Sequence, residues 1–170
     1  MFLVGSSLSE IIHGSTENDI FYAKQGRDTI FGLEGEDYIR AGKDNDFVQG
    51  GFGHDTIFGD LGNDSLQGNT GNDSILGGNG DDTIRGGKGE DVILGNNGND
   101  IIHGDIGNDA ANGNEGSDTL YGGEGNDFLR GGKDNDVIDG GKGDDILRGD
   151  EGADVIDAGE GEDTVVFLGS

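Results

Sequence analysis

An aspartate recurs at every ninth residue along almost the whole chain, and this period constrains the fold more than any other feature. The series has no insertion and takes up 17 of the 26 aspartates: Asp19, Asp28, Asp37, Asp46, Asp55, Asp64, Asp73, Asp82, Asp91, Asp100, Asp109, Asp118, Asp127, Asp136, Asp145, Asp154 and Asp163. The residue two places after each of them is apolar, and only Ala111 among these is small. Such a period indicates one small unit stacked many times, because a single unit cannot bury its apolar side chain alone.

Each unit is predicted to be a turn followed by a short strand. We number the nonapeptide so that the aspartate is position six; position four is then Gly in 14 of 17 copies, and position one is Gly or Ala in all. Glycine permits the positive φ of a tight turn, and an apolar position eight between two outward-facing neighbours fits a three-residue strand. Two nonapeptides, or eighteen residues, would form one coil. Stacked coils predict an all-β fold, a right-handed parallel β-roll (β-helix) solenoid with a thin core of position-eight side chains.

The composition favours a partner of positive charge. Only 30% of the chain is hydrophobic, 38 residues are Gly, and the formal net charge is −26, which alone is typical of disordered acidic segments. This charge excludes simple attraction to nucleic acid or to an anionic membrane surface and favours cations. No segment is long and apolar enough to be a membrane span. The absence of cysteine excludes a disulfide framework and a zinc thiolate site.

Two consecutive copies, "GGNGDDTIR" and "GGKGEDVIL", resemble the nonapeptide GGxGxDxUx of the RTX, or haemolysin-type calcium-binding, family. The resemblance covers residues 14–166 as seventeen repeats. Residues 1–13, with Glu10 and Ile12 in phase, are predicted to form a degenerate N-terminal coil or cap, and residues 167–170 a tail. The resemblance implies that each Ca²⁺ lies between two turns that are two nonapeptides apart, bound by both position-six carboxylates and by backbone carbonyls of positions one to four.

The resemblance thus implies two columns of calcium ligands with one member per coil. One column holds Asp19, Asp37, Asp55, Asp73, Asp91, Asp109, Asp127, Asp145 and Asp163, and the other holds Asp28, Asp46, Asp64, Asp82, Asp100, Asp118, Asp136 and Asp154. Their eight and seven gaps predict up to about 15 Ca²⁺ ions, and a sixteenth if Glu10 pairs with Asp28. Fifteen ions would carry 30 positive charges against the −26 of the chain. Ca²⁺ takes about six to eight oxygen ligands in a tolerant geometry, which carboxylates and turn carbonyls can supply. Mg²⁺ is smaller and tends to keep its water ligands, so it suits such sites less well.

Several copies depart from the repeat pattern. The first has Glu17 at position four, and the second has Ala23 and Lys24 in place of glycines, so failure of these first turns would lower the number of ions. Asp44 and Asp134 replace the glycine of position four. We expect those two turns to survive, because Asp tolerates left-handed backbone better than most residues. The pair of alanines in "DAANG" is expected to thin the core in mid-roll.

These features predict a calcium-binding module that folds when it binds Ca²⁺. Cytosolic free calcium lies far below the ~10⁻⁴–10⁻³ M at which extracellular calcium modules load. By resemblance, this suits export of an unfolded chain through a type I secretion channel and a secreted or extracellular location. The alternative is a structural spacer or surface-array segment of a large adhesin, in which calcium only stiffens the rod.

No enzyme is predicted. His13, His54 and His103 form no known catalytic spacing, and neither a nucleophile elbow nor a phosphate-binding loop occurs. A role as the C-terminal module of a secreted protease or lipase would require a catalytic domain that these residues do not supply.

One outer face of the roll is predicted to be richer in apolar side chains than the other. Positions seven and nine after the Asp19 column supply Ile20, Tyr22, Tyr38, Phe58, Leu76, Val92, Leu94, Phe128, Ile146 and Val166. A contiguous apolar face is a candidate contact surface. We therefore expect this face to meet a partner domain or another copy of the chain.

Overall fold

The computed structural model describes residues 1–167, which form 19 β-strands and no helix. The strands are β1 (Phe2–Val4), β2 (Ile11–His13), β3 (Ile20–Gln25), β4 (Thr29–Glu34), β5 (Tyr38–Lys43), β6 (Phe47–Phe52), β7 (Thr56–Leu61), β8 (Ser65–Thr70), β9 (Ser74–Asn79), β10 (Thr83–Lys88), β11 (Val92–Asn97), β12 (Ile101–Ile106), β13 (Ala110–Glu115), β14 (Thr119–Glu124), β15 (Phe128–Lys133), β16 (Val137–Lys142), β17 (Ile146–Glu151), β18 (Val155–Asp157) and β19 (Thr164–Val166). No helix able to cross a membrane occurs in this part of the chain.

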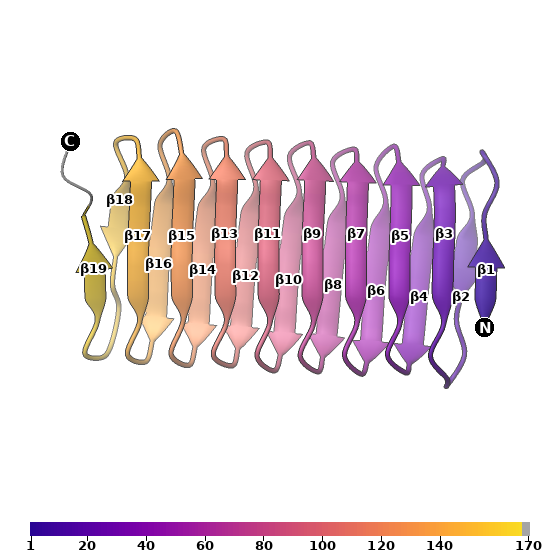
Figure 1. Cartoon of the computed structure of the whole chain (residues 1–170), viewed down its shortest axis with the longest axis horizontal. Helices are drawn as coiled ribbons and strands as arrows, with labels where there is room; N and C mark the ends of the chain where they lie inside the picture. The colour runs from indigo at the N-terminus through magenta and orange to yellow at the C-terminus, as the bar shows by residue number, and fades with distance from the viewer. Residues whose placement is uncertain (168–170) are drawn as a thin grey trace.

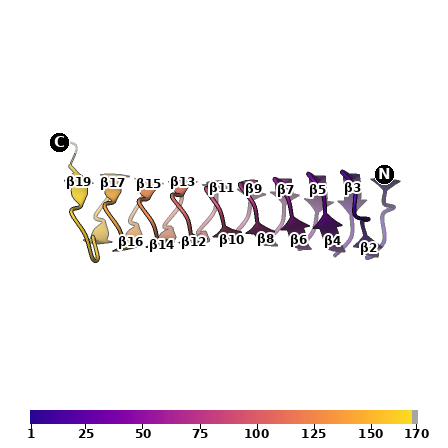
Figure 2. The same cartoon turned by 90° about the horizontal axis from the view of Figure 1, so that it is seen from below.

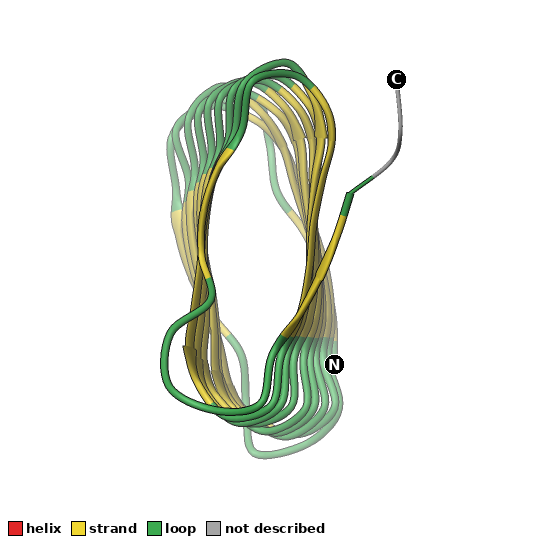
Figure 3. Cartoon of the chain, turned by 90° about the vertical axis from the view of Figure 1, so that its left-hand side faces the viewer, coloured by secondary structure: helices red, strands yellow, loops and turns green. Residues whose placement is uncertain are grey.

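The strands form two parallel sheets that face each other, one of the ten odd-numbered and one of the nine even-numbered strands (Figure 1). Each strand pairs with the strand two further along the chain, which is two nonapeptides away, as Ile84 pairs with Leu66 and Ile102. In Figure 1 the chain rises through the nearer sheet, descends through the farther one and advances from the N end, which makes the coil right-handed. Figure 2 shows the two layers from below, and Figure 3 shows the coils superposed as one flattened ring. The predicted β-roll with two nonapeptides per coil is confirmed.

Most strands have six residues, so the predicted length of three was wrong. Strand β10 covers positions seven to nine of one nonapeptide and positions one to three of the next, and it buries both Ile84 and Gly86. The small residue at position one continues the inward side of the strand, so backbone pairing extends into positions two and three. Only β1, β2, β18 and β19, at the two ends of the roll, have three residues.

The core is one thin layer of side chains between the two sheets, and the sheets contribute its members alternately. Its buried members are the position-eight residues Phe21, Ile30, Ile39, Val48, Ile57, Leu66, Ile75, Ile84, Ile93, Ile102, Ala111, Leu120, Leu129, Ile138 and Leu147, with Ala23 and Ala41 from position one. Leu3 and Ile12 at one end, and Ile156 and Val165 at the other, are partly buried against it. The core is therefore as thin as predicted, and it is thinnest at Ala111.

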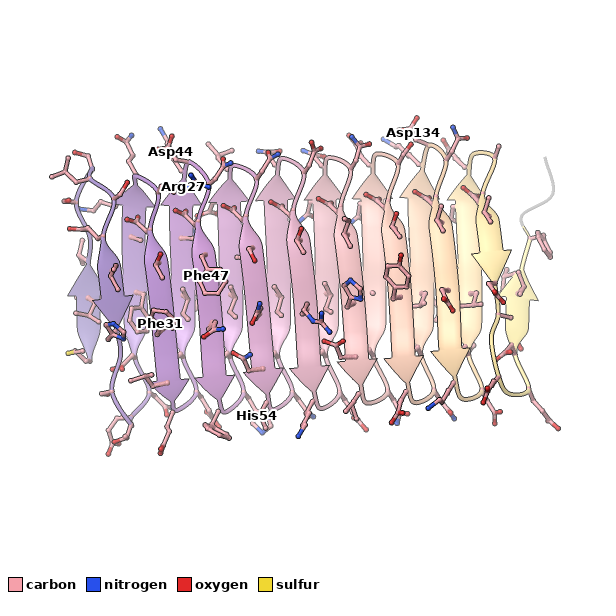
Figure 4. The ribbon with its side chains drawn as sticks, turned by 180° about the vertical axis from the view of Figure 1, so that it is seen from behind. Arg27, Phe31, Asp44, Phe47, His54 and Asp134 are labelled. Atoms are coloured by element: carbon pink, nitrogen blue, oxygen red, sulfur yellow. The ribbon has the colours of Figure 1, made fainter. Side chains whose placement is uncertain are left out.

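The turns rely on left-handed backbone at positions two and four. Asp44 (φ 77°) and Asp134 (φ 72°) adopt it at position four, in place of the usual glycine. Both lie along one edge of the roll in Figure 4, where the turns have the same shape as their neighbours. The expectation that aspartate would preserve these two turns is confirmed.

The two ends of the chain are described up to residue 167. Strands β1 and β2 join the two sheets in the register of the roll, with Leu3 opposite Phe21 and Ile12 opposite Ile30. Of the predicted tail, Phe167 is exposed, and residues 168–170 lie outside the described part. The ten apolar residues of the predicted contact face all belong to odd-numbered strands and so share one sheet. Contact of that face with a partner stays a prediction.

Candidate metal centre

The structure places the position-six aspartates in two columns along opposite edges of the roll. Each aspartate directly precedes a strand, so the Asp19 column lies where the odd-numbered strands begin and the Asp28 column where the even-numbered strands begin (Figure 1). The fifteen aspartates from Asp19 to Asp145 are buried, with at most 4% of each residue exposed. Asp154 and Asp163, in the last coil, are half-buried. Carboxylates are almost never fully buried unless they are paired, so each of these needs a partner.

One oxygen of each carboxylate is bound by the coil before it. The backbone N–H of Asp73 donates to Oδ1 of Asp91 at 2.7 Å, and the N–H of Asp91 donates to Oδ1 of Asp109 at 2.8 Å. The same bond joins all fifteen consecutive pairs in the two columns. This ladder fixes the orientation of every carboxylate, because its first oxygen is tied to a neighbouring backbone.

The other oxygen, Oδ2, is buried without a hydrogen-bond partner among the described residues in fourteen of these carboxylates. They are Asp28, Asp37, Asp46, Asp55, Asp64, Asp73, Asp82, Asp91, Asp100, Asp109, Asp118, Asp127, Asp136 and Asp145. A buried polar atom without a partner costs about 1–3 kcal/mol, and more when it is charged. Because the same unpaired oxygen recurs at fourteen equivalent positions, each of these oxygens is a candidate ligand of a bound ion.

In ten of the fourteen repeats, the partnerless oxygen and a carbonyl oxygen of the next coil both border the space beside the position-one glycine. A methyl group on Gly86 would lie 2.3 Å from Oδ2 of Asp91 and 2.9 Å from the carbonyl oxygen of Gly104, which belongs to the next coil. The space beside Gly50 is bordered in the same way by Asp55 and Gly68. Oxygens of this kind suit a hard cation such as Ca²⁺. The residues fit calcium in this respect.

The remaining ligands would have to come from the backbone. Among residues 1–167 there is no group of three or more His, Cys, Asp or Glu side chains that could hold a metal ion. A site between two coils therefore offers at most two position-six carboxylates, and carbonyl oxygens of the turns must complete it. Ca²⁺ accepts carbonyl oxygens readily, whereas zinc sites use mainly Cys and His.

Burial raises the pKa values of the fourteen column carboxylates from Asp28 to Asp145 above the ordinary 3.8. The pKa rises to about 7 for Asp73, Asp82 and Asp109, mainly because burial disfavours the charged form; the backbone N–H bond opposes the rise, and neighbouring carboxylates of the column add to it. These carboxyl groups are therefore partly protonated near neutral pH unless a bound cation replaces the protons.

Asp19 differs from the other members of its column. Its Oδ2 accepts hydrogen bonds from the N–H of Ser15 at 2.7 Å and from Oγ of Ser15 at 2.9 Å. Burial again disfavours its charged form, but bonds from the amino group of Met1 and from Ser15 outweigh burial and lower the pKa of Asp19. Its carboxylate is thus already satisfied by the protein.

A second ladder, at position five, was not anticipated from the sequence. The N–H of Asn63 donates to Oδ1 of Asn45 at 3.1 Å, and the N–H of Asp81 donates to Oδ1 of Asn63 at 3.2 Å. His54 takes part as well, because its Nδ1 accepts the N–H of Asn72 at 2.7 Å. It lies on the turn edge opposite Asp44 in Figure 4. The available signal was the asparagine found at position five in eight of 17 copies.

The chain matches a family model described as RTX calcium-binding nonapeptide repeat (4 copies). The matches overlap and cover residues 4–39, 13–48, 32–66, 58–93, 76–111, 103–138, 112–147 and 130–165, which together span nearly the whole chain. Comparison with curated proteins gave no match.

Proposed function

Because the chain belongs to the RTX calcium-binding nonapeptide repeat family, we propose that its two columns of aspartates bind Ca²⁺ between consecutive coils and that the roll folds when they do. The observation that carries this proposal is the set of fourteen buried Oδ2 atoms without a partner. The ligands would be the position-six carboxylates and carbonyl oxygens of the turns, such as that of Gly104 beside Asp91. Bound calcium would supply the positive charge that the buried carboxylates lack.

Folding on binding is supported by how little else holds the coils together. One apolar side chain per nonapeptide enters the core, while the ordering of every residue costs backbone entropy. Without a cation, each column would bring buried carboxylates of like charge together in successive coils. Bound calcium would reduce the repulsion between the carboxylates and would give each partnerless oxygen a ligand bond. A ligand that binds only the folded state shifts the folding equilibrium toward that state.

The location proposed for this folding is outside the cell. Members of the family are typically found in secreted bacterial proteins. Calcium modules of weak affinity load in the ~10⁻⁴–10⁻³ M range, far above cytosolic levels. A chain of this kind would stay unfolded before type I secretion and would fold after it.

A spacer within a large adhesin is the second candidate function. It is favoured by the uniformity of the roll, in which one register of two nonapeptides per coil continues from β1 to β19. The family is a structural calcium-binding module and not a known enzyme family. Both candidate functions use the same calcium sites. In the first, the parent protein depends on folding of the roll when calcium binds; in the second, it depends on the stiffness of the folded rod.

A calcium titration of the metal-free chain, followed by far-ultraviolet circular dichroism, tests the proposal. We expect a mostly disordered chain in EGTA and cooperative formation of β-structure as Ca²⁺ reaches millimolar concentration, because stacked repeats fold together. Magnesium at the same concentration serves as the control and is expected to induce much less structure. An unchanged spectrum across the calcium titration would overturn the proposal.

A further inference from the structure

Two carboxylates at the start of the roll are bound by a serine four residues before them. Ser15 donates to Oδ2 of Asp19 from its N–H at 2.7 Å and from its Oγ at 2.9 Å. Ser6 binds both carboxylate oxygens of Glu10, because its N–H donates to Oε2 at 2.9 Å and its Oγ donates to Oε1 at 3.0 Å. From the second repeat onward, the corresponding position two holds Gly, Asn, Asp, Lys or Leu, and none of these copies contains serine there.

The backbone of these first turns also differs from that of every later turn. From Lys24 to Gly161, each residue at positions two and four has a positive φ, but Ser15 and Glu17 do not. This change of conformation brings the N–H of Ser15 onto the carboxylate, where no later turn places a donor. The space beside Gly14 differs as well. A methyl group there would lie 2.2 Å from the carbonyl oxygen of Gly32 and 2.9 Å from Oδ2 of Asp19, as in later repeats, but also 2.9 Å from a carbon of the Phe21 ring. An apolar atom thus narrows this space, whereas only a carboxylate and a carbonyl oxygen border it beside Gly86.

Fourteen junctions between successive coils of the two columns each contain one partnerless Oδ2, which makes each junction a candidate calcium site. Asp37 shows the rule, because its Oδ1 accepts the N–H of Asp19, while its Oδ2 faces the carbonyl oxygen of Gly50 in the following coil. The fourteen partnerless Oδ2 atoms divide equally between the two columns, seven in each, and for ten of them the space beside the position-one glycine also borders a carbonyl oxygen of the following coil. The gap between Asp19 and Asp37 is the fifteenth, and there Oδ2 is already bound by two donors.

We propose that serine replaces calcium at the first nonapeptide, so that the gap between Asp19 and Asp37 takes no ion and the roll loads fourteen Ca²⁺ ions. This inference rests on the proposed calcium binding and identifies the one junction of the two columns at which no ion binds. The N–H of Ser15 points at the oxygen that a cation would need, and it repels positive charge there. Glu10 supplies no further site beside Asp28, because Ser6 already binds both of its carboxylate oxygens.

Native mass spectrometry of the calcium-loaded chain counts ions as integers and tests this proposal with matched variants. We expect fourteen ions for the wild-type chain and the same number for Asp19→Asn, whose calcium midpoint should move by less than about two-fold, because a terminal coil has few neighbours. Asp91→Asn, the matched interior variant, should lose at least one ion. The double variant Ser15→Gly with Glu17→Gly restores the repeat pattern and should gain a fifteenth ion.

The possible outcomes separate this inference from the proposed function. Fifteen ions in the wild-type chain, with fourteen in Asp19→Asn, would overturn the serine closure and leave calcium binding in place. A chain that binds no calcium would overturn the proposed function itself. If Asp19→Asn fails to fold, as judged by circular dichroism at saturating calcium, the double variant decides alone: an extra ion supports the closure, and an unchanged number contradicts it.

Discussion

The first nonapeptide and the middle nonapeptides place the same residue type in the same buried position and yet give it different partners. Asp19 and Asp91 are each about 1% exposed, and both have Oδ1 bound from the preceding coil. They differ in Oδ2, which Ser15 satisfies in the first nonapeptide and which has no partner at Asp91. Burial and sequence period alone therefore do not leave an aspartate with a partnerless oxygen in this fold. The residue four positions earlier decides whether the second oxygen has a hydrogen-bond donor.

The largest effect should come from pH and calcium together, because every middle coil is involved. Folded, metal-free Asp73 and Asp82 have pKa values of about 7 against 3.8 for the free residue. Below pH 3.8 both residues are protonated in the folded and in the unfolded chain, so they do not oppose folding. Between about pH 4 and about pH 7 the folded chain binds more protons than the unfolded chain, so the free energy of unfolding falls as the pH rises. We expect a dialysed, metal-free chain to show more β-structure at pH 5 than at pH 7.5.

The same linkage predicts that protons compete with calcium. The calcium midpoint measured by circular dichroism should rise as pH falls from 7.5 toward 5.5, because ions must displace protons from the carboxylates. Asp19, whose pKa is lowered, contributes nothing to this window. A calcium midpoint independent of pH would show that the buried carboxylates are not the ligands.

A smaller effect is expected from changing one carboxylate, and its size should depend on position in the column. Asp91 borders the gaps toward Asp73 and Asp109, whereas Asp163 borders only the gap toward Asp145. Asp91→Ala should therefore damage two sites next to the thin core at Ala111 and lower cooperativity clearly more than Asp163→Ala, which frays an end. Calorimetric titration of both variants measures this. Equal losses of bound calcium and equal midpoints would mean that the carboxylates are not shared between coils.

The position-five ladder should contribute less than a calcium site. Asn63 accepts the N–H of Asp81 and donates its own N–H to Asn45. Replacing Asn63 by Ala removes one acceptor and should lower the stability of the calcium-loaded roll by about 1 kcal/mol. Glu90 at the same position accepts no such bond among the described residues, so Glu90→Ala is the matched control and should change stability less. Thermal unfolding at saturating calcium compares the two, and an equal change in both would assign no role to the ladder.

The smallest effect is expected from the ion pairs on the outer faces. Arg85 binds Asp105 with two hydrogen bonds, at 2.9 Å and 2.5 Å, and the same pair recurs five nonapeptides away in each direction, as Arg40 with Asp60 and Arg130 with Asp150. The Arg85 side chain is half exposed, and exposed pairs contribute about 0.2–1 kcal/mol. Arg85→Ala should therefore leave the calcium midpoint unchanged, and a shift comparable to that of Asp91→Ala would contradict this ranking.

The fold could be predicted from the sequence because each nonapeptide contacts only its neighbours. A period of nine, with one apolar residue per unit, leaves few arrangements other than stacked coils, and the core from Phe21 to Leu147 follows from it. The predicted strand length was wrong because glycines at position one, such as Gly86, favour a turn by local propensity. Their small size instead lets the inward side of the strand continue, which depends on the distance between coils and not on local propensity.

The candidate site was predictable in its residues but not in its limits. The aspartates were identifiable because their period coincides with that of the core. The sequence also marked the first copy as irregular through Glu17. The hydrogen bond from Ser15 to Asp19 depends on backbone conformation, which one irregular copy does not reveal. The position-five ladder was overlooked because asparagine is common in turns for purely local reasons.

Anomalous X-ray scattering from crystals of the calcium-loaded chain tests most directly whether calcium binds the partnerless oxygens between coils. We predict one calcium peak in each of fourteen gaps, such as the gap between Asp91 and Asp109, and no peak between Asp19 and Asp37. Calcium peaks outside the two columns, or none beside the buried aspartates, would contradict this prediction.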